Sequence, residues 1–263
     1  MKKKNAGPSI FKRLLKITLT VLVIAGMGAA FICGQTYRNN RVCTGLEASV
    51  TDSLSNRFIK AEEVEGLIRR EYGEFLDIPC KETDIAEIER IIDSQDAVRK
   101  SQVFFKRDGM MNVIIDQREP VVRFQMGRNG FYADSEGVLF PLQSRYTARV
   151  IVIDGKMPIT WENFKEKNFN VRQQVWLDGV VELANTLKDD FVWNGKISQI
   201  HCSPTYGMML IPKEGNERFI IGEPEKIPQK LKKMGKYYTH IKTAKDKKYT
   251  RIDLRYDGQI ICK

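Results

Sequence analysis

Residues 17–37 read ITLTVLVIAGMGAAFICGQTY, and this run separates a short N-terminal tail from the rest of the chain. It contains no charged side chain. At about 1.5 Å per helical residue its length is about 30 Å, the thickness of the hydrocarbon core of a bilayer. A helix satisfies its own backbone N–H and C=O groups in lipid. The run therefore predicts a transmembrane helix over residues 17–37.

The charges that flank this run predict its orientation. Six basic residues and no acid precede it: Lys2, Lys3, Lys4, Lys12, Arg13 and Lys16. Only Arg38 and Arg41 follow it before Glu47. Because basic residues stay in the cytoplasm, we expect residues 1–16 inside and everything after Tyr37 outside the inner membrane. A cleaved signal peptide also begins with basic residues, but its apolar core is shorter and ends at a small-residue cleavage site.

The composition indicates folded domains outside the membrane. Of the 263 residues 42% are hydrophobic and 29% are charged, which is ordinary for a globular protein. About 225 residues follow the apolar run, enough for two modest domains with cores of their own.

The net charge of +10 comes partly from residues 226–248, where Asp246 is the only acid after Lys226. Nucleic acid is an unsuitable partner for this basic group if the group lies outside the cytoplasm. An acidic protein face or anionic lipid headgroups fit better. A solvated helix face is the simpler alternative.

Four cysteines follow the membrane run and would face an oxidising compartment: Cys43, Cys80, Cys202 and Cys262. Their even number permits the disulfides Cys43–Cys80 and Cys202–Cys262, one in each domain. Buried free thiols are the alternative that the spacing leaves open.

The first exported part, residues 38–119, has the pattern of a small α+β domain. Apolar residues at helical spacing predict helices over residues 58–72 and 83–94, the second capped by Thr83 or Asp84. Strands are expected around residues 46–50, over 101–107 and over 110–117, the last two joined by an Asp108-Gly109 turn. The order strand, helix, helix, strand, strand predicts two helices on one face of a three-stranded sheet.

The second exported part, residues 120–263, reads as a mainly antiparallel β domain with flanking helices. It begins at a proline, which interrupts strand pairing. Strands are expected in five places: a hairpin over residues 131–142, and strands at 150–154, 197–203, 207–211 and 218–222. A helix is expected over residues 170–188 and a basic helix from Pro228. The alternation in YTRIDLRYDGQII (residues 249–261) predicts a final strand at the edge of the sheet.

Four motifs occur in order behind the apolar run: REPV (118–121), YADSEGVLF (132–140), FIIG (219–222) and IDLRYDG (252–258). Together with the single anchor and the strand-helix-helix-strand-strand order, they resemble the FtsQ/DivIB family of bacterial cell division proteins. The resemblance covers nearly the whole chain. It implies one transmembrane helix, a POTRA domain over residues 38–119 and a β domain over residues 120–263.

The resemblance also implies a function without catalysis, cofactor, metal or small-molecule substrate. Proteins of this family act in the divisome at the septum, where they hold FtsB-like and FtsL-like partners and support septal peptidoglycan synthesis. The partner adds a strand to the C-terminal edge of the β domain, because an edge strand presents unpaired N–H and C=O groups.

Carried onto this sequence, the resemblance places the partner contact at Leu254, Tyr256, Gly258 and Ile260. Tyr256 is the expected aromatic anchor, and Gly258 would let another backbone approach closely. The simpler alternatives are packing of Tyr256 against the domain core and an ordinary Asp-Gly turn at Gly258.

Two other classes of function remain to be weighed. An anchored envelope enzyme finds little support, since His201 and His240 have no metal-binding spacing and no GxSxG turn is present. Asp189 and Asp190 read as a helix end rather than a catalytic pair. A POTRA-containing envelope assembly or secretion factor usually has several POTRA modules, and this chain has room for one.

Overall fold

The computed structural model describes residues 10–39, 41–51, 58–144, 146–244 and 249–263. The first nine residues of the predicted basic tail and residues 245–248 of the basic group lie outside these ranges. Helix α1 spans Ile10–Asn39, and its apolar window, Leu14–Ile32, has a mean hydropathy of 2.1 with no residue buried. By length and composition α1 can cross a membrane.

Contacts divide the chain into two compact units. The first consists of residues 1–49, 61–94 and 100–115, and the second consists of residues 50–60, 95–99 and 116–263. The POTRA-like part has the predicted element order. Its elements are β1 (Gly45–Thr51), α2 (Ala61–Glu71), α3 (Ile85–Asp93), β2 (Val98–Phe105) and β3 (Met110–Gln117). The strand order is β1-β3-β2. Asp84 caps α3 as expected, because its carboxylate accepts the N–H of Glu87 at 3.0 Å.

A nine-stranded sheet forms the second unit, in the order β12-β11-β10-β9-β8-β7-β4-β5-β6. The strands are β4 (Pro120–Met126), β5 (Asn129–Asp134), β6 (Leu139–Pro141), β7 (Ile151–Gly155), β8 (Ile197–Ser203), β9 (Gly207–Pro212), β10 (Arg218–Gly222), β11 (Arg251–Asp253) and β12 (Ile261–Cys262). The helices are α4 (Trp161–Glu166), α5 (Val171–Asp189), α6 (Ile227–Lys236), the π-helical turn η1 (Tyr237–Ile241) and α7 (Lys242–Ala244). The α+β fold predicted from the sequence is therefore confirmed.

The sheet is mixed rather than uniformly antiparallel. Strand β7 runs parallel to both of its neighbours, β4 and β8, and β10 runs parallel to β11. The other pairs of described strands are antiparallel. Pro120 begins β4 instead of interrupting the sheet, since a proline is tolerated as the first residue of a strand.

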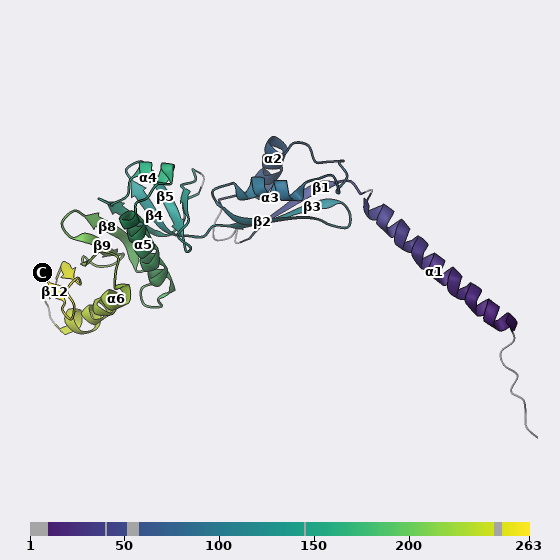
Figure 1. The fold of residues 1–263 in the computed structure, drawn as a ribbon. Helices are drawn as coiled ribbons and strands as arrows, with labels where there is room; N and C mark the ends of the chain where they lie inside the picture. The colour runs from purple at the N-terminus through teal and green to yellow at the C-terminus, as the bar shows by residue number, and fades with distance from the viewer. Residues whose placement is uncertain (1–9, 40, 52–57, 145, 245–248) are drawn as a thin grey trace, which may run out of the picture. The chain divides into compact units, whose positions relative to one another are not determined.

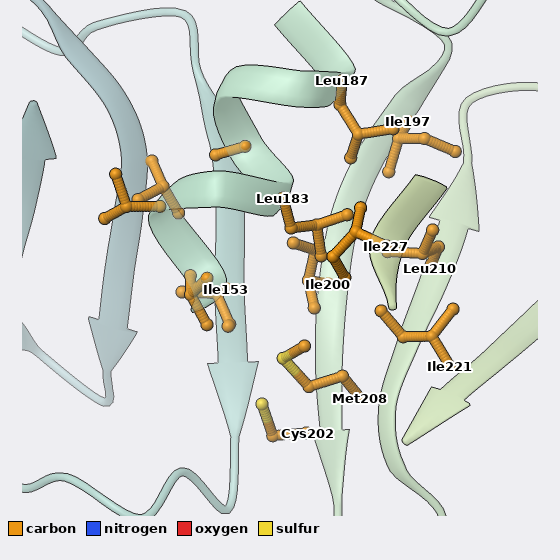
Figure 2. Close-up of a cluster of buried hydrophobic side chains, with 14 of the residues drawn as sticks. Ile153, Leu183, Leu187, Ile197, Ile200, Cys202, Met208, Leu210, Ile221 and Ile227 are labelled. Atoms are coloured by element: carbon orange, nitrogen blue, oxygen red, sulfur yellow. The ribbon is translucent and has the colours of Figure 1, made fainter. Parts of the chain in front are cut away.

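Helices α5 and α6 lie against the same face of this sheet and bury its main core (Figure 1). Figure 2 shows Leu183 and Leu187 of α5 pointing toward Ile200 and Ile197 of β8. Burial of large aliphatic side chains is worth about 1.5–3 kcal/mol each, so this layer stabilises the strands that reach the C-terminal edge.

Two helical glycines differ in what surrounds them, so we expect their replacement by alanine to have opposite effects on the stability of the protein. A Cβ at Gly66 of α2 would meet nothing within 4 Å, whereas one at Gly179 of α5 would lie 2.5 Å from the carbonyl oxygen of Pro224. Gly66→Ala should stabilise its unit by about 0.5–1 kcal/mol, because alanine restricts the unfolded chain. Gly179→Ala should destabilise its unit by about 1–3 kcal/mol through overpacking. Calorimetric unfolding of the two variants measures both; a stabilised Gly179→Ala protein would contradict the close packing of α5.

Candidate partner-binding site

The last part of the chain forms two short strands joined by a turn. Strand β11 pairs in parallel with β10, and β12 then returns antiparallel to β11, with Ile252 opposite Cys262 and Asp253 opposite Ile261. The single long strand predicted from the alternation over residues 249–261 is wrong. The outermost strand is β12, which covers the outer side of β11.

Side chains from two elements hold the turn between β11 and β12. The N–H of Arg255 donates to Oδ1 of Asp253 at 3.1 Å, which bends the chain just after β11. Lys233 of α6 donates from Nζ to the carbonyl oxygen of Leu254 and, at 2.9 Å, to that of Tyr256. Gly258 has a φ of +71°, which favours glycine, and it lies inside the turn.

The four predicted contact residues therefore lie in different environments. The side chain of Leu254 is wholly buried in the core, so only its backbone is placed to meet a partner, and its contact stays a prediction. Tyr256 is 50% exposed on the turn. A Cβ at Gly258 would meet nothing within 4 Å, so the chain leaves room for a partner there. Ile260 packs, partly buried, against the main core.

Sequence reasoning missed a cluster of arginine and tyrosine side chains beside this turn. Tyr206, from the β8–β9 turn, accepts a hydrogen bond from Nη1 of Arg251 at 2.8 Å. The guanidinium of Arg255 lies 5.9 Å from the ring centre of Tyr206 and 5.7 Å from that of Tyr256. Both contacts are in the range of cation–π attraction. No sequence spacing connects Tyr206 with residues 251–256, because sheet pairing brings them together.

Asp253 fixes the guanidinium of Arg255 in this cluster. Nε of Arg255 lies 3.0 Å from Oδ1 of Asp253, and Nη2 lies 2.7 Å from Oδ2. Burial alone would raise the pKa of Asp253, but the hydrogen bonds and charge of Arg255 outweigh it and lower that pKa. The pair presents an oriented cation beside Tyr256.

This ion pair predicts a loss of stability in acid. A carboxylate with a lowered pKa contributes stability above its unfolded pKa, about 3.9, and loses that contribution as the pH falls through its folded value. We expect the unfolding free energy of the second unit to fall as the pH drops from 5 to 3. Asp253→Asn should reduce this fall, whereas Glu166→Gln, at an exposed position, should leave it unchanged. Denaturant unfolding at each pH measures the effect; identical pH profiles for the wild type and Asp253→Asn would contradict it.

Lysines at the start of α6 and within it bind side-chain and backbone oxygens of the second unit. Nζ of Lys226 lies 2.9 Å from Oδ2 of Asp257. Lys230 is buried and donates to the carbonyl oxygen of Glu223 at 2.8 Å, and burial lowers its pKa. With Lys233, these side chains have structural partners, so only part of the basic group is a solvated face.

The sheet edges differ in how accessible they are to another strand. The N–H groups of Ser101 and Val103 on β2 are taken by Oδ1 of Asp93 at 2.6 Å and Oε1 of Glu89 at 2.8 Å. These carboxylates from α3 stand where the carbonyl groups of a neighbouring strand would be. Strand β6 is only three residues long and ends in Pro141, which has no N–H. Among the described strands none pairs with the outer side of β12.

The structure contains neither of the disulfides that the cysteine count permits. Cys202 on β8 and Cys262 on β12 are separated by three strands, or about 19 Å at the usual strand spacing, far beyond the reach of a disulfide. Cys43 and Cys80 lie on paired segments, but the thiol of Cys43 contacts the carbonyl oxygen of Gly45 at 3.5 Å instead.

His201 and Asp190, two of the residues considered for catalysis, have partners within the fold. Nδ1 of His201 lies 2.8 Å from Oδ1 of Asp154, and the neighbouring Cys202 is buried, which raises its thiol pKa to about 12. A thiol of that pKa is a poor nucleophile at neutral pH. Asp190 caps the end of α5 and binds the N–H of Val192 at 2.7 Å, as expected of a helix end.

Models of known protein families match both folded parts of the chain. A family model described as FtsQ/DivIB, C-terminal related matches residues 119–263, which is more than half of the chain. The chain belongs to the FtsQ/DivIB family. A POTRA-like domain model matches residues 41–116, the part that contains β1, α2, α3, β2 and β3. No curated protein matches the chain significantly.

Membership in the FtsQ/DivIB family makes the chain a division-associated, POTRA-containing protein with one helix able to span a membrane. The family consists of non-enzymatic division scaffolds. The cluster of Tyr206, Arg251, Arg255 and Tyr256, together with β12, is the candidate site for partner binding in its C-terminal domain.

Proposed function

We propose that this protein is a division scaffold that holds FtsB-like and FtsL-like partners at the septum and supports septal peptidoglycan synthesis without catalysing a reaction itself. The observation that carries the proposal is β12, a sheet edge with no strand on its outer side among the described residues. An added strand gains backbone hydrogen bonds at such an edge, and flanking side chains select it.

The side chains next to this edge determine the kind of strand that fits. Arg251 supplies positive charge, the guanidinium of Arg255 lies beside Tyr256 in its pair with Asp253, and Tyr206 and the half-exposed Tyr256 supply aromatic surface. A partner strand with acidic and apolar residues complements this surface. Arginine and tyrosine are also the residue types that most often dominate binding energy at interfaces.

The proposed orientation places both folded units outside the cytoplasm. It rests on the excess of basic residues before α1 over those directly after it. The protein would then be a single-pass component of the inner membrane, with its N-terminus in the cytoplasm and its POTRA-like and β domains in the periplasm or its equivalent.

Depletion in live cells tests the role in division. A fluorescent fusion should form a band at mid-cell, and depletion should give filaments without septa. Normal septation in depleted cells would overturn the proposal.

Partner capture tests the site itself. Tyr256→Ala should reduce recovery of the FtsB-like partner with the full chain in detergent at least tenfold. Arg255→Glu should do the same, because it reverses the charge beside Tyr256. Arg128→Glu makes the same charge change in the exposed β4–β5 turn and should bind normally. Equal recovery by all of these variants would move the interface elsewhere.

A further inference from the structure

A groove of about 770 Å³ lies in the second unit, away from the β11–β12 turn. Its walls come from the turn before β8, the end of β9 and the helical segment of α6 and η1. The strand register places the groove at the opposite end of the sheet from that turn. The groove lies where β8 begins and β9 ends, since Ile197 pairs with Pro212. The turn lies toward the other end, because it follows Asp253, which pairs with Ile220 late in β10. The groove is therefore separate from the site for strand addition.

The inner wall of the groove is aromatic. Trp193 and Tyr238 both line it, and their ring centres are 5.8 Å apart. Within the described part of the chain, neither the indole N–H of Trp193 nor the phenol O–H of Tyr238 has a hydrogen-bond partner. Burial raises the pKa of Tyr238 to about 12, so its hydroxyl remains a donor at physiological pH. Trp193 itself is buried in the main core, so the apolar surface and the hydrogen-bond donor that this wall offers come mainly from the partly buried Tyr238.

The rim of the groove is basic. Lys196, Lys213 and Lys242 line it, and Glu214 is the one acid among the lining residues. Lys242 is already neutralised, since it pairs with the buried carboxylate of Glu217 and its Nζ lies 5.0 Å from the ring centre of Tyr238. Lys196 and Lys213 are exposed and have no ion-pair partner among the described residues. These two ammonium groups remain available to an anionic ligand.

An ordered turn presents apolar side chains beside this groove. Phe191 is 100% exposed and Val192 is 49% exposed. Oδ1 of Asp190 accepts the N–H groups of Val192 at 2.7 Å and Trp193 at 3.1 Å, which fixes the turn. Val192 lines the groove, and the adjacent Phe191 adds exposed apolar surface that a partner bound there could cover.

We propose that the groove docks an acidic peptide segment of a partner protein, in addition to the strand added at β12. An apolar side chain of that segment packs on Trp193 and Tyr238, and its carboxylates pair with Lys196 and Lys213. The positive rim selects for acidic residues, and the concave aromatic wall favours a single inserted side chain over a flat lipid surface.

Two labelled peptides that differ only in charge test this site. Both are decamers with the same leucine and phenylalanine positions, with glutamate in one (EELFEELLEE) and lysine in the other (KKLFKKLLKK). Fluorescence anisotropy with the full chain in neutral detergent should show at least tenfold tighter binding of the acidic peptide. This preference should weaken as salt is added, because salt screens the rim lysines.

Charge reversal locates the binding. Lys196→Glu/Lys213→Glu should lower the affinity for the acidic peptide at least tenfold, and Phe191→Ala should lower it severalfold. Lys81→Glu/Lys165→Glu changes the net charge equally at exposed positions outside the groove and should bind as the wild type does. Equal binding of the two peptides, or equal loss in both double variants, would overturn the proposal. So would groove-dependent binding to phosphatidylglycerol vesicles or groove-dependent self-association in place of acidic-peptide binding.

Discussion

Replacing Lys233 with methionine is expected to weaken capture of the FtsB-like partner about tenfold, although Lys233 is not itself a proposed contact. Its ammonium group holds the carbonyl groups of Leu254 and Tyr256 and thereby orders the turn that carries the tyrosine. Hydrogen bonds to a charged group are worth about 1.5–3 kcal/mol each, and a tenfold change in affinity corresponds to about 1.4 kcal/mol. Titration of the labelled partner against the full chain measures the loss.

Hydrogen exchange distinguishes this ordering role from a direct contact. The amides of residues 254–259 should exchange faster in Lys233→Met without partner present, while the core strands keep their protection. Lys232→Met, at the exposed neighbouring position of α6, should change neither exchange nor affinity. Unchanged exchange in Lys233→Met would disprove the ordering role. Faster exchange with unchanged capture of the partner would show that the turn is not part of the interface.

Phe219→Ala should produce the largest loss of stability among these variants, about 3–5 kcal/mol. Phe219 is fully buried on β10, between β9 and β11, and its ring lies 5.4 Å from that of Tyr237 and 5.6 Å from that of Tyr238. The substitution leaves a cavity under the strand that supports β11. The edge strand β12 should loosen with it.

Tryptophan fluorescence during denaturant unfolding reports this loss, because all three tryptophans, Trp161, Trp176 and Trp193, belong to the second unit. Phe191→Ala is the matched control, since it removes the same side chain from a fully exposed position. Its stability should stay within about 0.5 kcal/mol of the wild type. A small effect of Phe219→Ala would show that the core around β10 collapses to fill the space.

Local patterns predicted the POTRA-like part well. Strand β3 spans the predicted residues 110–117, and the capped helix α3 lies inside the predicted range of 83–94. Its elements follow one another closely, so apolar spacing, a helix cap and an Asp-Gly turn determine them. Helix α4 was missed because six residues carry too little periodicity, although Thr160 and Asn163 form a capping box at its start.

Contacts between distant residues limited the prediction of the second unit. Strand β7 pairs in parallel with β4 and β8. The spacing of residues within one segment does not show which distant strand will lie beside it. The error over residues 249–261 has the same origin. The alternation continues through Tyr256, but Lys233, more than twenty residues earlier, bends the backbone after Leu254. The resemblance alone placed the candidate site at residues 254–260, which stays a prediction, whereas the arginine and tyrosine side chains beside this turn could be found only from the fold.

The carboxylates of Glu89 and Asp93 have a consequence for many copies confined together. Proteins that are tethered at high local density in a membrane meet often, and exposed edge strands can then pair with one another and aggregate. In the POTRA-like part, the two carboxylates accept the N–H groups of Ser101 and Val103 on β2, which another strand would need for pairing. Pairing of another copy's strand with β2 is therefore blocked at these two positions.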